Sequence, residues 1–218
     1  MSIGFVLASL TSAGAAGPEL KSDEQKTLYA LGIVISRNLA SFNLSAADLE
    51  HVQAGLSDGV FHKEPKVDLQ TYGPRIQGLQ ATRVTAMAAG EKKAGQVFAD
   101  KAAAEKGATR TASGMIISTL KAGTGASPKP IDTVKVHYHG TLIDGTVFDS
   151  SVNGGEPATL PLNRVIKCWG EGLQAMKVGG KSRLVCPSEM AYGDRGAPPK
   201  IKPGATLVFE VELLDIVK

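Results

Sequence analysis

The chain has 218 residues, enough for one large domain or for two small domains that each bury a core of their own. Its 24 Lys and Arg residues and 21 Asp and Glu residues leave a net charge of +3, which is spread along the sequence. Proteins that bind nucleic acid usually carry a clustered basic surface, so this distribution argues against a nucleic acid partner.

The start of the chain has the pattern of an export signal. Residues 3–10 form a short apolar run, and the small residues that follow contain Ala13-Gly14-Ala15, an A-x-A cleavage pattern. We therefore expect residues 1–16 to be a signal peptide and the protein to work in the periplasm, outside the cell or at the outer membrane. No Lys or Arg precedes the apolar run, however, so the alternative is the disordered or helical N-terminus of a cytosolic protein.

Residues 17–73 are predicted to form a helical domain. Ser22 and Gln25 have the spacing of a capping box, and Ser45 is placed to cap a second helix. Each helix has apolar residues at every third or fourth position, which predicts one buried face: Leu28, Leu31, Ile35, Leu39 and Phe42 in the first, Leu49, Val52, Leu56 and Val60 in the second. Two such short helices cannot close a core alone, so they are expected to pack on a partner chain or on the next segment.

Residues 74–112 are predicted to form a long connecting helix and a linker. Pro74 suits a first helical turn, and an Ala-rich sequence continues to about Gly107, which would give ~50 Å of helix. Its apolar residues are sparse, so we expect a largely solvated helix. The alternative is a flexible linker, because Gly78, Gly90 and Gly95 each disfavour a helix by roughly 1 kcal/mol.

Residues 113–218 are predicted to form short strands around a single helix. Apolar and polar residues alternate in the segment 134–142, and Asp144-Gly145 would supply the pair of positive φ angles of a hairpin turn. Further strands are expected at 115–121, 146–150, 159–162, 181–186 and 206–216, with the helix between 165 and 176. The fold class is therefore α+β, with an antiparallel sheet folded around one short helix.

The hairpin brings Phe148 and Asp149 beside Tyr138. Two aromatic rings and one acid, with no nucleophile and no base partner, indicate an apolar cleft that grips its substrate. His137 and His139 share a strand face but lack a third ligand, so no metal is expected and these side chains should face solvent. Gly180-Lys181-Ser182 lacks the first glycine of a phosphate-binding loop, and no cofactor is expected.

Several motifs of the C-terminal half, in this order, resemble the FKBP family of peptidyl-prolyl isomerases, which bind the macrolides tacrolimus and rapamycin. They are Val136-His137-Tyr138-His139-Gly140, Phe148-Asp149-Ser150-Ser151, Val165-Ile166 before Trp169, Glu171-Gly172-Leu173, Ala191-Tyr192-Gly193 and residues 205–213. The helical N-terminal half is similar to the bacterial macrophage infectivity potentiator subgroup. That resemblance implies an intertwined homodimer, in which an all-α dimerisation domain and the long helix precede an isomerase domain built as a half-barrel.

The resemblance also implies a substrate pocket. Its catalytic residues would be Tyr138, Phe148, Asp149, Ile166, Trp169, Tyr192 and Phe209, and its further substrate-binding residues would be Val165, Ala191, Ile201 and Ala158. By analogy with the family, the Ile166 amide and the Tyr192 hydroxyl hold the substrate carbonyls. Without the resemblance, lone aromatic residues in strands would be read as ordinary core residues.

Four positions depart from the family pattern. One is Ala197, at a loop position that is often held by His or another larger residue. Gly154 and Ala158 stand where small human-type domains have Arg and Phe, so we expect no ion pair to Asp149 and a more open pocket. Cys168 stands in place of a Gly before the tryptophan. In an oxidising compartment it could form a disulfide with Cys186, worth ~3 kcal/mol, and the alternative is two buried thiols.

These features favour an exported, homodimeric peptidyl-prolyl cis-trans isomerase that acts on unfolded or partly folded proline-containing polypeptides, has chaperone activity and is inhibited by tacrolimus or rapamycin. The alternative is a non-catalytic chaperone module that holds client or host proteins with the same pocket.

Overall fold

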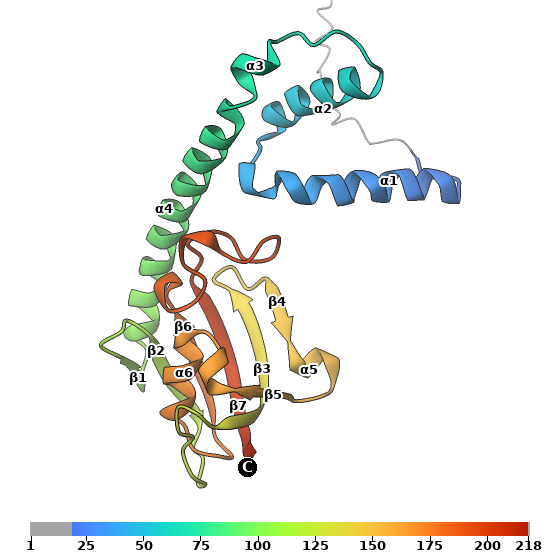
Figure 1. Cartoon of the computed structure of the whole chain (residues 1–218). Helices are drawn as coiled ribbons and strands as arrows, with labels where there is room; N and C mark the ends of the chain where they lie inside the picture. The colour runs from blue at the N-terminus through green and yellow to red at the C-terminus, as the bar shows by residue number, and fades with distance from the viewer. Residues whose placement is uncertain (1–18, 218) are drawn as a thin grey trace, which may run out of the picture. The chain divides into compact units, whose positions relative to one another are not determined.

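The computed structural model describes residues 19–217, so the predicted signal peptide lies outside the described residues (Figure 1). The described residues divide into two compact units, residues 19–38 and residues 39–217. The helices of the N-terminal half are α1 (Asp23–Ser36), the 3-10 helix η1 (Arg37–Phe42), α2 (Ala46–Val60), α3 (Leu69–Tyr72) and α4 (Arg75–Ala103). No helix among residues 19–217 is long and apolar enough to cross a membrane.

Helix α1 begins with the predicted capping box. The Ser22 Oγ accepts a hydrogen bond from the Gln25 amide at 3.1 Å, and the Gln25 Oε1 accepts one from the Ser22 amide at 3.1 Å. The apolar face predicted to be buried is exposed in the single chain, since Leu28 keeps 60% and Leu31 54% of its accessible surface.

Helix α2 begins with a second capping box, between Ser45 and Asp48. Asp48 also accepts two hydrogen bonds from the Arg83 guanidinium of α4, both at 3.0 Å. A third bond at 3.0 Å runs from Arg83 to the Phe42 carbonyl. One arginine of α4 therefore holds the start of α2, in agreement with the second of the two alternatives expected for these helices, a partner chain or the segment that follows.

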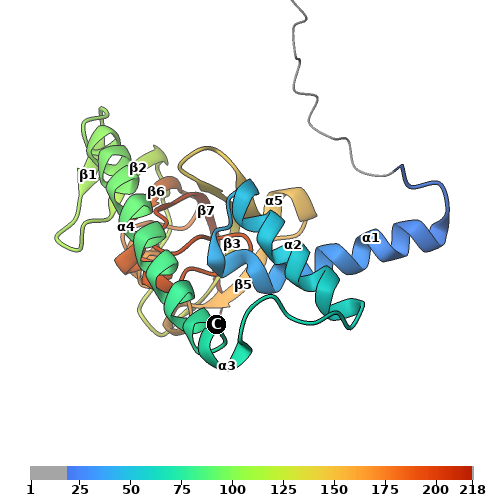
Figure 2. The same ribbon diagram turned by 90° about the horizontal axis from the view of Figure 1, so that it is seen from above.

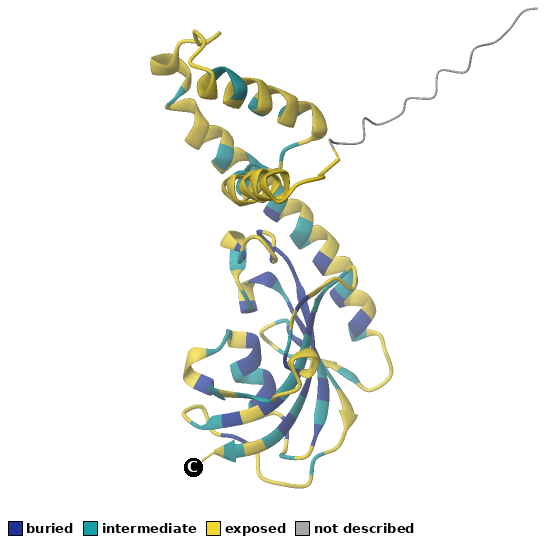
Figure 3. Ribbon diagram, turned by 90° about the vertical axis from the view of Figure 1, so that its right-hand side faces the viewer, coloured by how far each residue is buried: buried dark blue, intermediate teal, exposed yellow. Residues whose placement is uncertain are grey.

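Helix α4 is continuous over 29 residues, ~43 Å, so the alternative of a flexible linker was wrong. Pro74 occupies the N-cap position, just before the first turn. The expectation of a largely solvated helix holds for its first half only. Ala88, Gly95, Ala99 and Ala102 are buried in its second half, which runs alongside β1, β2 and β6 (Figures 2 and 3). Such small residues form no apolar stripe in the sequence, and this is why the contact was missed.

The C-terminal half contains a single antiparallel sheet, which confirms the α+β class. Its order is β1-β2-β6-β7-β3-β4, and β5 pairs with the other end of β3. The strands are β1 (Ala108–Arg110), β2 (Ile116–Lys121), β3 (Thr133–Leu142), β4 (Val147–Ser150), β5 (Ala158–Pro161), β6 (Lys181–Cys186) and β7 (Leu207–Val217).

Several short elements had no counterpart in the sequence analysis, among them β1 and the helix α5 (Ser151–Gly154). Strand β1 pairs with β2, with Thr109 opposite Ile117, so the sheet begins before the boundary predicted at residue 113. Elements of three or four residues are too short to show a periodic pattern.

The hairpin between β3 and β4 differs from the prediction at its turn. Gly145 has a φ of 86°, but Asp144 is not among the residues with positive φ. The loop has three residues and is closed by a 2.9 Å hydrogen bond from the Leu142 amide to the Thr146 carbonyl. In three-residue hairpin loops only the last residue adopts the left-handed conformation, so the expected pair of positive φ angles was wrong.

The core lies between the sheet and helix α6 (Lys167–Gln174), as Figure 1 shows. Helix α6 contributes Cys168, Trp169 and Leu173, all of which are buried. They pack in one cluster with residues that alternate along the strands: Val134, Val136, Leu184, Leu207, Phe209, Val211 and Leu213. This arrangement fixes α6, and with it the floor of the site described below.

Candidate active site

Four aromatic side chains from four elements meet at one end of this core. The ring of Trp169 stands edge-on to Tyr138 of β3 at 5.1 Å between centroids, and edge-on to Phe209 of β7 at 5.3 Å. Phe148 of β4 meets Phe209 in the same way at 5.5 Å. Each such edge-to-face pair stabilises the fold by ~0.5–1.5 kcal/mol beyond its area burial. The four rings form a rigid apolar wall.

A cavity of about 340 Å³ opens above these rings. Every residue predicted to be catalytic lines it, together with Val165, and so do two residues that the sequence analysis missed, Leu160 and Arg164. Both missed residues lie close to predicted ones in the chain, on β5 and in the 3-10 helix η2 (Leu162–Arg164), but their residue types carry no signal of their own.

Three of the predicted substrate-binding residues do not line the cavity. Ile201 is 5% exposed and belongs to the core. Its amide and carbonyl both bond to Ala197, which turns this part of the loop inward. Ala158 and Ala191 are half-buried and pack against the same core from outside the cavity.

The polar edge of the cavity is built by Tyr138 and Asp149. The Tyr138 hydroxyl donates a 2.7 Å hydrogen bond to Asp149 Oδ2. Burial, and then the hydrogen bond to this carboxylate, raise the pKa of Tyr138 to about 12. The other carboxylate oxygen accepts a 2.9 Å bond from the Ser150 amide. Tyr138 thus orients the acid that an arginine pairs with in small human-type domains.

Ile166 and Tyr192 line the cavity from different elements. Ile166 is the N-cap of α6, and its carbonyl accepts the amides of Trp169 and Gly170 at 3.0 and 3.1 Å. Its own amide has no acceptor among the residues that the structure describes. Tyr192 precedes the 3-10 helix η4 (Gly193–Arg195) and is 44% exposed, so its hydroxyl is open to a ligand.

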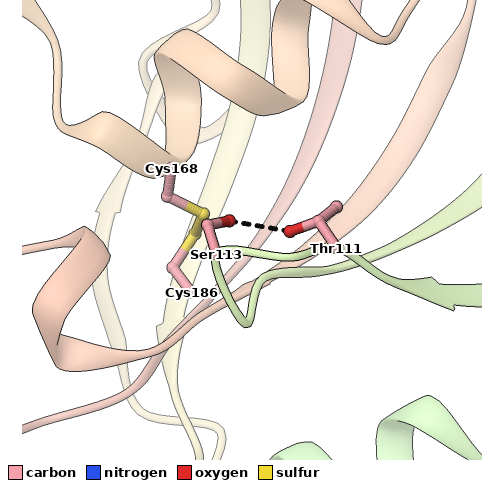
Figure 4. Close-up of a disulfide and its surroundings, with 4 residues drawn as sticks. All are labelled: Thr111, Ser113, Cys168 and Cys186. Carbon is pink, nitrogen blue, oxygen red and sulfur yellow. Dashed lines mark hydrogen bonds between the residues drawn. A yellow bond between two sulfur atoms is a disulfide. The ribbon is translucent and has the colours of Figure 1, made fainter.

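Cys168 and Cys186 are joined by a disulfide, with 5.7 Å between their Cα atoms (Figure 4). Both residues are fully buried. The bond ties the first turn of α6, where Trp169 lies, to the end of β6. Figure 4 also shows Thr111 and Ser113 beside it, with their hydroxyls 2.7 Å apart.

The two histidines of β3 lie on the face of the strand away from the cavity and are half-buried. The Nδ1 of His137 lies 3.2 Å from the Ser151 hydroxyl, and the Nδ1 of His139 lies 3.1 Å from the Ser150 hydroxyl. The expectation that they simply face solvent was therefore wrong. Within residues 19–217, no group of three or more His, Cys, Asp or Glu side chains could hold a metal ion.

Comparison with known proteins places this geometry in a family. Residues 124–214 match the FKBP-type peptidyl-prolyl cis-trans isomerase family, and residues 24–116 match the domain amino terminal to such isomerases. The FKBP-type 22 kDa peptidyl-prolyl cis-trans isomerase of Escherichia coli is 40% identical, over 92% of this chain and 98% of the relative. The chain belongs to the FKBP-type peptidyl-prolyl cis-trans isomerases.

Further similarities identify the subgroup of this FKBP-type isomerase. The isomerase FkpA of Aeromonas hydrophila is 41% identical over 92% of this chain and 79% of the relative. The isomerase Mip of Coxiella burnetii is 35% identical over 100% of this chain and 96% of the relative. The crystal structure of FkpA from Escherichia coli has a TM-score of 0.69 and 38% identity, and covers 91% of this chain and 98% of that one. The predicted relation to the macrophage infectivity potentiator subgroup is confirmed, and with it the isomerase activity.

Proposed function

We propose that X-Pro bonds rotate inside the aromatic cavity, with the prolyl ring on Trp169 and between Tyr138, Phe148 and Phe209. The observation that carries this assignment is the lining itself, in which five aromatic rings and a single acid surround a space of about 340 Å³. Rotation about the imide faces a barrier of ~18–20 kcal/mol, because resonance makes the C–N bond partly double. An apolar cavity removes the water that stabilises the planar, polar form, and so favours the twisted one.

Three polar groups would hold the peptide during rotation. The unpaired Ile166 amide and the exposed Tyr192 hydroxyl are donors for the carbonyls of the substrate. Asp149, oriented by the Tyr138 hydroxyl, would make the edge of the cavity polar next to the reacting carbonyl of the substrate. No covalent step is needed, because each contact acts only by binding the twisted bond better than the planar one.

The test is isomerisation of a short Leu-Pro peptide with and without rapamycin. Loss of one hydrogen bond of 0.5–1.5 kcal/mol should lower kcat/KM roughly 2- to 10-fold, in Tyr192→Phe and again in Asp149→Ala. Val147→Ala is the control, since Val147 adjoins Phe148 in β4 but is 46% exposed and lies outside the cavity. Full activity in both variants would refute the assigned roles. Absence of acceleration by folded wild-type protein would leave only the non-catalytic binding module.

We also infer that the protein is a homodimer formed through its N-terminal helices and that it acts as a chaperone on proline-containing polypeptides. Support comes from the exposed apolar face of α1, where Leu28 and Leu31 are more than half accessible in the single chain. Light scattering should give twice the chain mass, and Leu31→Glu should yield a folded monomer. A wild-type monomer at micromolar concentration would refute the dimer. Suppression of aggregation of a denatured client would test the chaperone activity.

The cellular location proposed is the periplasm or another oxidising compartment outside the cytosol. The disulfide between Cys168 and Cys186 supports it, because such bonds rarely persist in the cytosol. Fractionation of cells that produce the full chain tests this assignment. Recovery of the protein with the cytosolic marker, and with both thiols reduced, would contradict it.

A further inference from the structure

The second half of α4 is ion-paired to the loop that carries Tyr192. Lys92 Nζ lies 2.5 Å from Asp194 Oδ1 and 3.3 Å from Glu189 Oε1. Glu189 lies three residues before Tyr192, and Asp194 lies two residues after it. A single ammonium group of the helix therefore bridges both flanks of a tyrosine that lines the cavity.

A second ion pair fixes the far end of the same loop. Glu91, which precedes Lys92 in α4, lies 3.2 Å from the ammonium group of Lys202. The Glu91 side chain is 24% exposed and that of Lys92 is 37% exposed, while those of their partners Lys202, Glu189 and Asp194 are 57%, 64% and 67% exposed, so the ion pairs lie at the surface. The hydrogen bond from Lys92 to Asp194 is the largest of the effects that raise the pKa of this lysine, so it stays charged throughout the physiological range.

Close packing fixes the position of α4 against the loop. Gly95 lies directly against Thr206, and a Cβ at this position would come within 2.9 Å of the Thr206 Cβ. Ala88, two turns earlier, is 4% exposed. These small residues bring the helix backbone against the end of the loop, so Lys92, which lies between them in sequence, cannot shift along it without a clash.

The core side of this loop is held by Met190, Ile201 and Ala205, which are buried in the main cluster, and by a 2.8 Å hydrogen bond from Lys200 Nζ to the Phe148 carbonyl. The loop lies outside the sheet, between β6 and β7, and Tyr192 itself is 44% exposed. Among the described residues, its backbone is closed by the 2.9 Å bond from the Gly204 amide to the Gly193 carbonyl and by the pairing of Ala197 with Ile201. These bonds join the loop to itself, and the ion pairs of α4 hold its polar side on both flanks of Tyr192.

We propose that Lys92 is a positioning residue for the isomerase, which holds Tyr192 at the cavity by bridging Glu189 and Asp194. The inference rests on the role proposed above for Tyr192. It also means that α4, which lies in the segment matched by the amino-terminal domain, contributes to the active site of the C-terminal domain.

The test compares Lys92→Ala with Lys93→Ala in the full chain. Lys93 is the next residue of α4, it is exposed, and the described residues give it no ion pair. Lys92→Ala should lower kcat/KM for a Leu-Pro peptide about 2- to 10-fold and weaken tacrolimus binding by a similar factor. The fluorescence of the single tryptophan, Trp169, reports that binding directly. Unfolding midpoints should stay equal, because exposed ion pairs contribute little to stability.

Exchanging the charges of Lys92 and Asp194 distinguishes a positioning role of Lys92 from a simple loss of packing. Lys92→Glu should lower kcat/KM at least as much as Lys92→Ala, and Asp194→Lys added to it should restore most of the activity. No recovery in the exchanged pair, or equal activity of Lys92→Ala and Lys93→Ala, would overturn the proposal.

A double-mutant cycle with Tyr192→Phe separates this inference from the proposed function. If Lys92 acts through Tyr192, the two losses must be less than additive in the double variant, and fully additive losses would overturn the inference. A loss in Tyr192→Phe with none in Lys92→Ala would overturn the inference alone. Full activity of Tyr192→Phe would instead refute the proposed role of Tyr192.

Discussion

Reduction of the disulfide between Cys168 and Cys186 should lower the free energy of unfolding of the C-terminal domain by about 3 kcal/mol. The two cysteines are separated by 18 positions in the chain. Opening a loop of this length returns roughly 11 cal/mol/K of conformational entropy to the unfolded chain, which is about 3 kcal/mol at 25 °C. Reduction is a cleaner change than substitution, because both side chains are fully buried and their truncation would add a cavity.

The assay is urea unfolding followed by the fluorescence of Trp169, with and without a phosphine reductant. With a slope of ~1–3 kcal/mol/M, the midpoint should fall by roughly 1–3 M. A thiol count of two, which equals the cysteine content of the chain, shows that reduction is complete. Activity should fall as well, since the bond anchors the helix turn that carries Trp169. A midpoint that moves by less than about 0.3 M after complete reduction would refute the loop-entropy argument.

Three further predictions follow from buried or paired groups. The fold raises the pKa of Tyr138 to about 12, so the protonated hydroxyl contributes its full stabilisation below pH 10, and this contribution is lost as the pH rises toward about 12. In alkaline unfolding curves, Tyr138→Phe should therefore lose less stability over that range than the wild type. Leu173→Ala, at a fully buried site of α6, should cost about 2–5 kcal/mol in urea unfolding. The Arg83 hydrogen bond lowers the pKa of Asp48 strongly, so the pair stabilises α2 fully at neutral pH, and this effect declines as the pH falls from the ordinary carboxyl value toward the lowered one. Arg83→Gln should therefore reduce the protection of α2 amides against exchange at pH 7, and the difference from wild type should be smaller at pH 2.

Each of these three expectations has a contrary result. Identical alkaline curves for wild type and Tyr138→Phe would show that the hydroxyl is not protected. A cost below 1 kcal/mol for Leu173→Ala would mean that the core closes around the gap. Equal exchange rates at pH 7 in wild type and Arg83→Gln would show that α2 does not depend on this pair.

The strongest sequence signals came from patterns that one element can satisfy by itself. The capping boxes at Ser22 and Ser45 require only three or four consecutive residues and an oxygen at the right spacing. Strand β6 was predicted with its observed bounds, because charged and apolar residues mark both ends of the run. The motifs in family order indicate the cavity, and they allow Tyr138, Phe148 and Trp169 to be assigned to it from the sequence.

The misplaced residues share a different cause. Ile201 was assigned to the pocket rim, but its bonds to Ala197 turn it into the core, and a loop of this kind has no periodicity from which its side-chain direction could be read. Arg164 was missed because an exposed arginine after a strand has no pattern of its own.

The sequence by itself determined the class of the fold and the order of its main elements, because hydrophobic periodicity and local capping depend on residues that are close together in the chain. The aromatic residues of the cavity were indicated by the resemblance to the family and not by periodicity. Only the tertiary structure decided that the second half of α4 lies against the sheet and that Lys92 meets both flanks of Tyr192. That contact depends on small residues, Gly95 and Ala99, which carry almost no hydrophobic signal. Their effect exists only when another surface comes close enough to use the space they leave.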